Sequence, residues 1–145
     1  MSGRLILDHF RNPRNAGHLS HPDGFGIEMD NPWAIAISIA LRVRKGIIQQ
    51  VRFEAQGCVT AIACASMLTE LVEGQSVKRA LSISHRELSE ALGTVPEEKL
   101  HCCGLAIGAL RKAINDSGKG RPAAAIVTGS GDKVSDNFSL TRSNK

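Results

Sequence analysis

Residues 34–54 place the strongest constraint on the fold. Ala34 to Val43 is mostly apolar and alternates β-branched isoleucines, which is the pattern of a strand. Lys45-Gly46 predicts a turn, and Ile48 to Glu54 has the composition of a second strand. Two strands joined by so short a turn pair as an antiparallel hairpin. We also expect a third strand near residues 24–29, within a Gly- and Pro-rich stretch, residues 17–32, that otherwise has the composition of a loop.

Helical spacing of apolar residues dominates the remaining segments. It predicts helices over Arg4–Phe10, from Thr60 to Val72, over Ser76–Leu81, from Ser84 to Leu92 and over Leu100–Ile114. Ser84-His85-Arg86-Glu87 has the form of a capping box. A helix, then strands, then helices indicates an α+β fold, in which a small antiparallel three-stranded sheet is packed by several helices.

The length of 145 residues fits one hydrophobic core. We expect a single domain over residues 1–127, in which Ala123 to Val127 adds a short strand or helix. Residues 128–145 are rich in Ser, Asn and charged side chains, which predicts a disordered tail.

Composition and charge exclude several functions. No segment approaches the ~20 apolar residues that cross a bilayer, so no membrane association is expected. The N-terminus lacks the apolar block of a signal peptide, and we expect a cytoplasmic protein. The net charge is +4, but the basic residues are scattered and only five aromatic side chains are present, four Phe and one Trp. We therefore expect no nucleic-acid partner.

The four cysteines are informative, because thiols in a reducing compartment more often bind metal, react or lie buried than form disulfides. Cys58 follows Gly57 at the point where a strand gives way to a helix. The partial positive charge of a helix N-terminus stabilises a thiolate there. The alternative interpretation is that Cys58 is a small buried apolar residue, since free cysteine is among the most buried residue types.

His101 and Cys102 stand at the start of the last helix. Together with Cys58 they form a set of ligands that suits zinc, ferrous iron or an iron–sulfur cluster. Cys64 lies in a helical stretch of small residues and is interpreted as packing, and Cys103 lies on the apolar face of its helix and is interpreted as core. The other histidines are expected to be structural or on the surface: His9, His18, His21 and His85.

Three blocks of sequence carry a resemblance to a known family. The first is Leu7 to Gly17, the second is Phe53 to Cys58 followed by Ala61 to Glu70, and the third is Lys99 to Cys102 followed by Leu105-Ala106 and Ala109-Leu110. In this order they resemble the IscU/NifU-type iron–sulfur cluster assembly scaffold family, over residues 4 to about 115.

The resemblance implies a scaffold rather than an enzyme, with a solvent-accessible site built from three loops. It implies that Cys58 and Cys102 bind the cluster and that His101 joins them as a metal ligand. The expected cargo is a labile [2Fe-2S] cluster or iron, and zinc also occupies such sites. The implied partners are a cysteine desulfurase, which supplies sulfur, and acceptor proteins that receive the cluster.

One corner of the family site is missing from this chain. Where the family has Asn-Pro-x-Cys-Gly-Asp, the chain has Asn31-Pro32-Trp33-Ala34-Ile35-Ala36. The matched positions therefore supply three ligands at most, and Asp30 or Cys103 is the candidate substitute. The family's Leu-Pro-Pro-Val-Lys chaperone segment is also altered, at residues 95–99, which weakens the expectation of a chaperone partner.

Three hypotheses follow from the missing corner. The first is a scaffold or carrier that holds iron or a cluster weakly, shared between the two subunits of a homodimer that give two thiolates each. The second is a site for one metal ion, zinc, with a structural or regulatory role. The third is a metal-free relative that keeps the surface for docking a cysteine desulfurase and acts by protein contact.

Overall fold

The computed structural model describes residues 2–118, which form a small sheet covered by helices. The elements in chain order are α1 (Ser2–Arg11), β1 (Gly24–Asp30), the short 3-10 helix η1 (Asn31–Trp33), β2 (Ile35–Arg44), β3 (Ile47–Gln56), α2 (Val59–Val72), α3 (Val77–Leu81), α4 (His85–Ala91), the 3-10 helix η2 (Glu97–Lys99) and α5 (Leu100–Ser117). The predicted α+β fold is confirmed. The third strand expected near residues 24–29 is β1, and the loop expected over residues 17–32 is wrong only for the end of that stretch, where Asp30 belongs to β1 and Asn31-Pro32 begin η1. The expectations for residues 123–127 and for the tail lie outside the described residues.

The sheet is antiparallel with the strand order β1-β2-β3, so the predicted hairpin and the third strand are both present. Its register places Ile39 of β2 opposite Gly26 on one side and Phe53 on the other. Alternate side chains of β2, including Ile37 and Leu41, are completely buried on the inner face. The alternation of isoleucines in the sequence thus marks the face on which the core forms.

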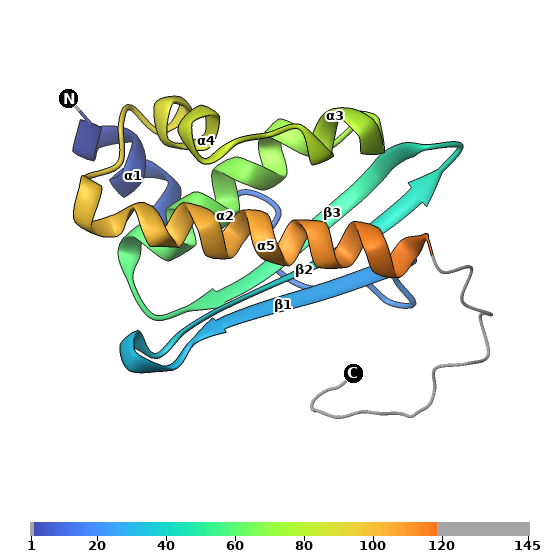
Figure 1. Ribbon diagram of the computed structural model, residues 1–145, viewed down its shortest axis with the longest axis horizontal. Helices are drawn as coiled ribbons and strands as arrows, with labels where there is room; N and C mark the ends of the chain where they lie inside the picture. The colour runs from blue at the N-terminus through green and yellow to red at the C-terminus, as the bar shows by residue number, and fades with distance from the viewer. Residues whose placement is uncertain (1, 119–145) are drawn as a thin grey trace.

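Helices α2 and α5 lie side by side on this inner face, and α1 packs on α2 (Figure 1). The contact of α5 with β1 depends on two glycines of the strand, because the helix backbone approaches closely. A Cβ atom at Gly26 would lie 2.3 Å from the Ala109 carbonyl oxygen, and one at Gly24 would lie 2.1 Å from that of Ala113. Glycine in a strand commonly marks such a close approach.

Serine side chains cap the two short helices. The Ser84 hydroxyl accepts a hydrogen bond from the Glu87 backbone N–H, as the capping-box pattern predicts, and the Ser76 hydroxyl does the same for Arg79. Each cap satisfies a backbone donor that the helix itself leaves without a partner. No helix in the described part of the chain is long and apolar enough to span a membrane.

His9 fixes α1 to α2 from a buried position, where only 3% of its surface is exposed. Its Nδ1 lies 2.7 Å from the Ser66 hydroxyl, which also accepts a hydrogen bond from the Arg14 backbone N–H. Its Nε2 lies 3.6 Å from a Glu70 carboxylate oxygen. This histidine is structural, as interpreted from the sequence. Burial and the nearby Arg14 guanidinium lower its pKa, and Glu70 opposes them only in part.

The lowered pKa of His9 predicts that the protein loses stability in mild acid. The unfolded chain takes up a proton at this histidine as the pH falls below about 6.5, whereas the folded chain resists it. Protonation therefore favours unfolding, and the thermal unfolding midpoint should be lower at pH 5.5 than at pH 7.5. A His9→Gln variant should show a smaller difference between the two values. An equal difference in both proteins would contradict the assignment to His9.

Candidate metal-binding site

Cys58 stands between β3 and α2, at the N-cap position of the helix. Gly57 before it has a φ of +125°, and a Cβ atom there would lie 2.8 Å from the Ile35 Cα atom. The turn therefore requires glycine. The Cys58 side chain is partly exposed and makes no capping hydrogen bond, so its sulfur is available at the positive end of α2.

The first turn of α5 brings two further side chains to the same place. Cys102 Sγ lies 3.8 Å from Cys58 Sγ, and His101 Nε2 lies 3.9 Å from Cys102 Sγ. The structure thus gathers the three side chains that the sequence singled out, from two helix N-termini. As they are placed, no group of three or more His, Cys, Asp or Glu side chains in residues 2–118 is arranged to hold a metal ion.

The distance between the two sulfurs is compatible with their binding a single metal ion. Zinc–sulfur bonds of ~2.3 Å at a tetrahedral angle separate two sulfurs by ~3.8 Å. Burial, with a smaller contribution from Cys58, raises the pKa of Cys102 to about 12. At neutral pH the metal-free thiol is therefore protonated, and a metal ion must displace its proton.

A second pair of thiols lies behind the first. Cys64 of α2 and Cys103 of α5 are both fully buried, as the sequence predicted for each, and their sulfurs are 3.6 Å apart. The contact with Cys103 and burial raise the pKa of Cys64, and Cys102 and Cys58 also contribute. No local pattern in the sequence indicates this pairing, because only the packing of α2 on α5 brings the two residues together.

The missing corner borders the site. The pairing of β2 with β3 ends at Ala36 opposite Gln56, and Ala34 stands just before β2 in a left-handed conformation, as the C-cap of η1. The Ala34 carbonyl oxygen would lie 3.1 Å from a Cβ atom at Gly57. Apolar side chains therefore stand where the family carries its cysteine and aspartate.

The two substitutes considered from the sequence differ in their placement. Cys103 is buried and contacts Cys64, away from the partly exposed sulfur of Cys58. Asp30 is partly exposed at the end of β1, where it pairs with Ile35 just before the replaced corner. Asp30 is therefore the substitute that lies nearer to the missing corner along the chain.

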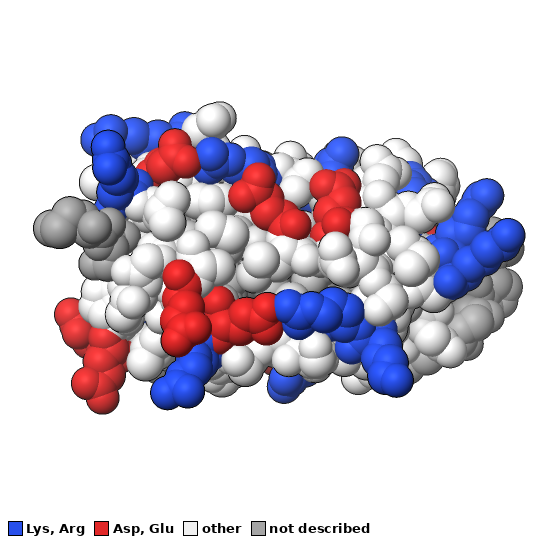
Figure 2. Space-filling model, turned by 90° about the horizontal axis from the view of Figure 1, so that it is seen from above, with Lys and Arg blue, Asp and Glu red and all other residues white. Residues whose placement is uncertain are grey.

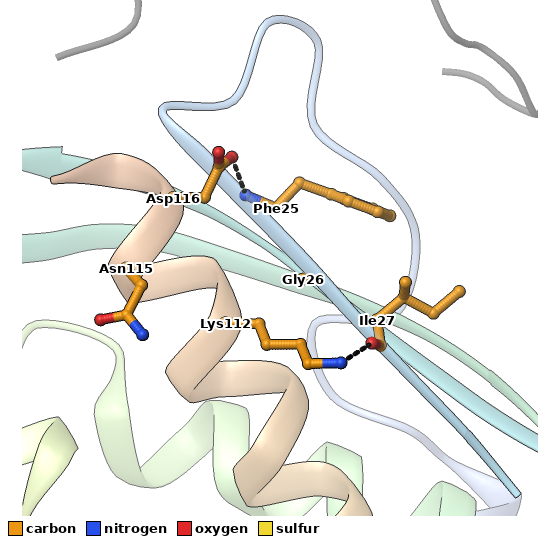
Figure 3. A pocket seen from close by; sticks show the side chains of 6 residues that line it. All are labelled: Phe25, Gly26, Ile27, Lys112, Asn115 and Asp116. Atoms are coloured by element: carbon orange, nitrogen blue, oxygen red, sulfur yellow. Dashed lines mark hydrogen bonds between the residues drawn. The ribbon is translucent and has the colours of Figure 1, made fainter. Parts of the chain in front are cut away.

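A shallow hollow lies between β1 and the C-terminal half of α5 (Figure 3). It is lined by Phe25, Gly26, Ile27, Lys112, Asn115 and Asp116. The Phe25 backbone N–H donates to the Asp116 carboxylate, and the Lys112 ammonium donates to the Ile27 carbonyl. These two bonds give hydrogen-bond partners to one backbone N–H and one backbone carbonyl of β1, the edge strand. Lys112 is ten residues beyond Cys102, ~15 Å along the helix, so the hollow is separate from the thiols.

The charges on the face shown in Figure 2 are of mixed sign. Lysine and arginine side chains are interspersed with aspartate and glutamate on this face. Arg79 pairs with Glu87, and Arg86 pairs with Glu90 within α4. This mixture agrees with the scattered charge of the sequence.

Comparison with known proteins gives consistent results. The family described as "NifU-like N terminal domain" matches residues 2–123. The "Iron-sulfur cluster assembly scaffold protein IscU 1" of Archaeoglobus fulgidus is 40% identical over 111 residues, which are 77% of this chain and 72% of that protein. The "Iron-sulfur cluster assembly scaffold protein IscU" of Aquifex aeolicus is 40% identical over 114 residues, with the same coverage.

Solved structures share the fold. The crystal structure of a nitrogen-fixing NifU-like protein (N-terminal) from Brucella abortus matches with a TM-score of 0.66 and 18% identity, over 81% of this chain and 94% of that one. A putative iron–sulfur cluster assembly scaffold protein for the SUF system of Fervidobacterium islandicum matches with a TM-score of 0.63 and 17% identity, over 77% and 94%. At such identities these matches concern the fold alone.

Proposed function

Because the chain belongs to the NifU-like N-terminal domain family, we propose that it is an iron–sulfur cluster assembly scaffold that binds iron or a [2Fe-2S] cluster as cargo. The observation that carries the proposal is the pair of sulfurs of Cys58 and Cys102, 3.8 Å apart on two different helices. In this reading the protein is a carrier and not an enzyme.

The number of ligands limits how the cargo is held. Cys58, Cys102 and His101 would give three ligands to one metal ion once their side chains turn toward it, and water would take the fourth position. A [2Fe-2S] cluster takes four protein ligands, usually cysteines, two on each iron. Two copies of the chain, each giving its two thiolates, would supply them, which makes a homodimer the loaded form.

The partners follow from this role. A cysteine desulfurase supplies the sulfur, and acceptor proteins take up the finished cluster in the cytoplasm. The altered segment before α5, which includes η2 (Glu97–Lys99), makes a chaperone a poor candidate for a partner. The scattered, mixed surface charge favours protein partners over nucleic acid.

A second candidate function is favoured by the missing corner. Ala34 and Ala36 put apolar side chains where a scaffold offers a thiolate and a carboxylate. A relative altered in this way would bind zinc, or no metal, and act through contact with a cysteine desulfurase as a regulatory or interaction protein.

Anaerobic reconstitution separates the two candidates. The protein is mixed with a cysteine desulfurase, cysteine and ferrous iron, and visible absorption and sulfide content are measured. A scaffold should form a cluster, and Ala34→Cys should slow the loss of that cluster to a chelator, because it returns a thiol to the position of the family's cysteine, beside Gly57 and the Cys58 turn. Ala16→Cys is the matched control. It adds an exposed thiol beside Phe53, ~16 Å along β3 from the site, and should change nothing.

The outcomes point in different directions. A cluster in the unchanged protein supports the scaffold. If the unchanged protein forms no cluster while Ala34→Cys forms one, the protein is not an assembling scaffold and the second candidate holds.

A further inference from the structure

The four cysteines form two contacting pairs, and the proposed metal site uses only one of them. The outer pair is Cys58 and Cys102, and the inner pair is Cys64 and Cys103. Cys102 and Cys103 are consecutive residues of α5, and Cys58 and Cys102 both lie close enough to Cys64 to help raise the pKa of its thiol, so the two pairs are neighbours. The inner pair has no part in holding the cargo, and its chemistry needs its own explanation.

The inner pair is suited to redox chemistry rather than to metal binding. Both residues are fully buried in the apolar core, whereas the outer pair includes the partly exposed Cys58, and a charged metal–thiolate centre with no solvent-exposed member would be costly. A disulfide is neutral and carries no such cost. The two sulfurs already lie in contact, 3.6 Å apart on two packed helices, and a disulfide would bring them to ~2.05 Å.

We propose that the inner pair reduces the outer pair after oxidation: the inner dithiol gives two electrons to the outer disulfide, which returns to the dithiol form. The inference rests on the proposed function in one respect, since it is the outer pair that must stay reduced to bind metal. The oxidant class is a peroxide, which reaches the partly exposed Cys58 first.

The chemistry balances in three steps. The Cys58 thiolate attacks hydrogen peroxide, which breaks the O–O bond, leaves a sulfenic acid on the sulfur and releases hydroxide. Cys102 then attacks that sulfur and expels the oxygen as water, which gives the outer disulfide. An inner thiol next attacks one outer sulfur, and the second inner thiol resolves the mixed disulfide. The products are the outer dithiol and the inner disulfide, with no further oxidant or reductant.

Preorganisation favours the inner disulfide over the outer one. Cys64 and Cys103 each lie inside a regular helix with a completely buried side chain, so little freedom is lost when they join. Cys58 lies at the junction of a strand and a helix, and its side chain is partly exposed. In a reducing compartment cellular thiols would later restore the inner dithiol by exchange through the partly exposed Cys58, because the inner disulfide itself is buried and disulfides in the cytosol are transient.

One equivalent of hydrogen peroxide, added to the reduced, metal-free full chain, tests the proposal. Free thiols are alkylated, disulfides are reduced, and the released thiols take a second label. Mass spectrometry then assigns each label from fragment ions between Cys58 and Cys64 and between Cys102 and Cys103, since trypsin does not separate these residues. The second label should be on the inner pair, and zinc binding should be retained.

The matched variant is Cys64→Ala, with Cys103→Ser as a second variant should the first fail to fold. Each variant lacks one of the two inner thiols and cannot form the inner disulfide. One equivalent of peroxide should therefore leave the outer pair as a disulfide and abolish zinc binding. An outer disulfide in the unchanged protein would overturn the proposal. The label positions do not depend on metal, whereas failure of the proposed function would appear in the untreated protein as no binding of zinc or iron.

Discussion

Replacement of Cys58 by alanine is expected to abolish metal binding. The change leaves only Cys102 and His101 of the gathered side chains, too few for a tetrahedral metal ion. Loss of a residue that only hydrogen-bonds to a metal ligand typically lowers metal affinity 10–100-fold. Loss of a thiolate that binds the metal directly should therefore lower it by at least ~100-fold. Competition with a chromophoric chelator for zinc or ferrous iron, under strictly reducing conditions, measures the change.

Cys64→Ala is the matched control for this experiment. It removes a thiol from the inner pair, but it leaves the 3.8 Å contact of the outer pair in place. Under reducing conditions its metal affinity should equal that of the unchanged protein. Equal stoichiometry and affinity in Cys58→Ala and Cys64→Ala would show that metal binds elsewhere, and the site proposed here would be wrong.

Gly26→Ala is expected to destabilise the fold strongly, although it adds only one methyl group. The new Cβ atom would lie 2.3 Å from the Ala109 carbonyl oxygen and 2.5 Å from the Ala113 backbone nitrogen. Both are backbone atoms of α5, so the whole helix must move away from the sheet. Overpacking of this kind costs about 3 kcal/mol or more. Denaturant unfolding should show the loss as a lower midpoint.

Gly108→Ala provides the comparison on α5 itself. Its Cβ atom would lie 2.8 Å from a Glu28 carboxylate oxygen, which is the movable end of a flexible side chain. The substitution also favours the helix by about 1 kcal/mol, because alanine loses less backbone entropy than glycine. The stability should therefore change little or rise. A loss as large as that of Gly26→Ala would contradict the role assigned to the close approach of the α5 backbone.

The sequence located the helices and the hairpin well, because their signals are local. Alternation in β2, helical spacing in α2 and α5, and the serine cap at Ser84 are each contained in a short stretch. β1 had a weaker signal. Gly24 and Gly26 resemble loop residues when taken alone, and only the backbone of α5 above them explains why a strand carries glycine there.

In the candidate site, too, some features follow from local sequence and others only from tertiary packing. Gly57-Cys58 and His101-Cys102 each stand at a helix start that the sequence predicted, and the resemblance to scaffold proteins linked them. Their separation of 3.8 Å depends on how α2 and α5 pack across the sheet. The distance cannot be predicted from the spacing of the two cysteines in the sequence, because they are 44 residues apart.

The sequence by itself thus determined the fold class, the helix starts that carry the thiols and the loss of the corner at Ala34. Each of these is a property of a short segment and of its residue types. Tertiary structure alone decided which thiols face one another: the partly exposed Cys58 with the buried Cys102, and Cys64 with Cys103 in the core. The physical reason is that side-chain contacts between distant helices are set by packing against a common sheet, and packing is a property of the whole core.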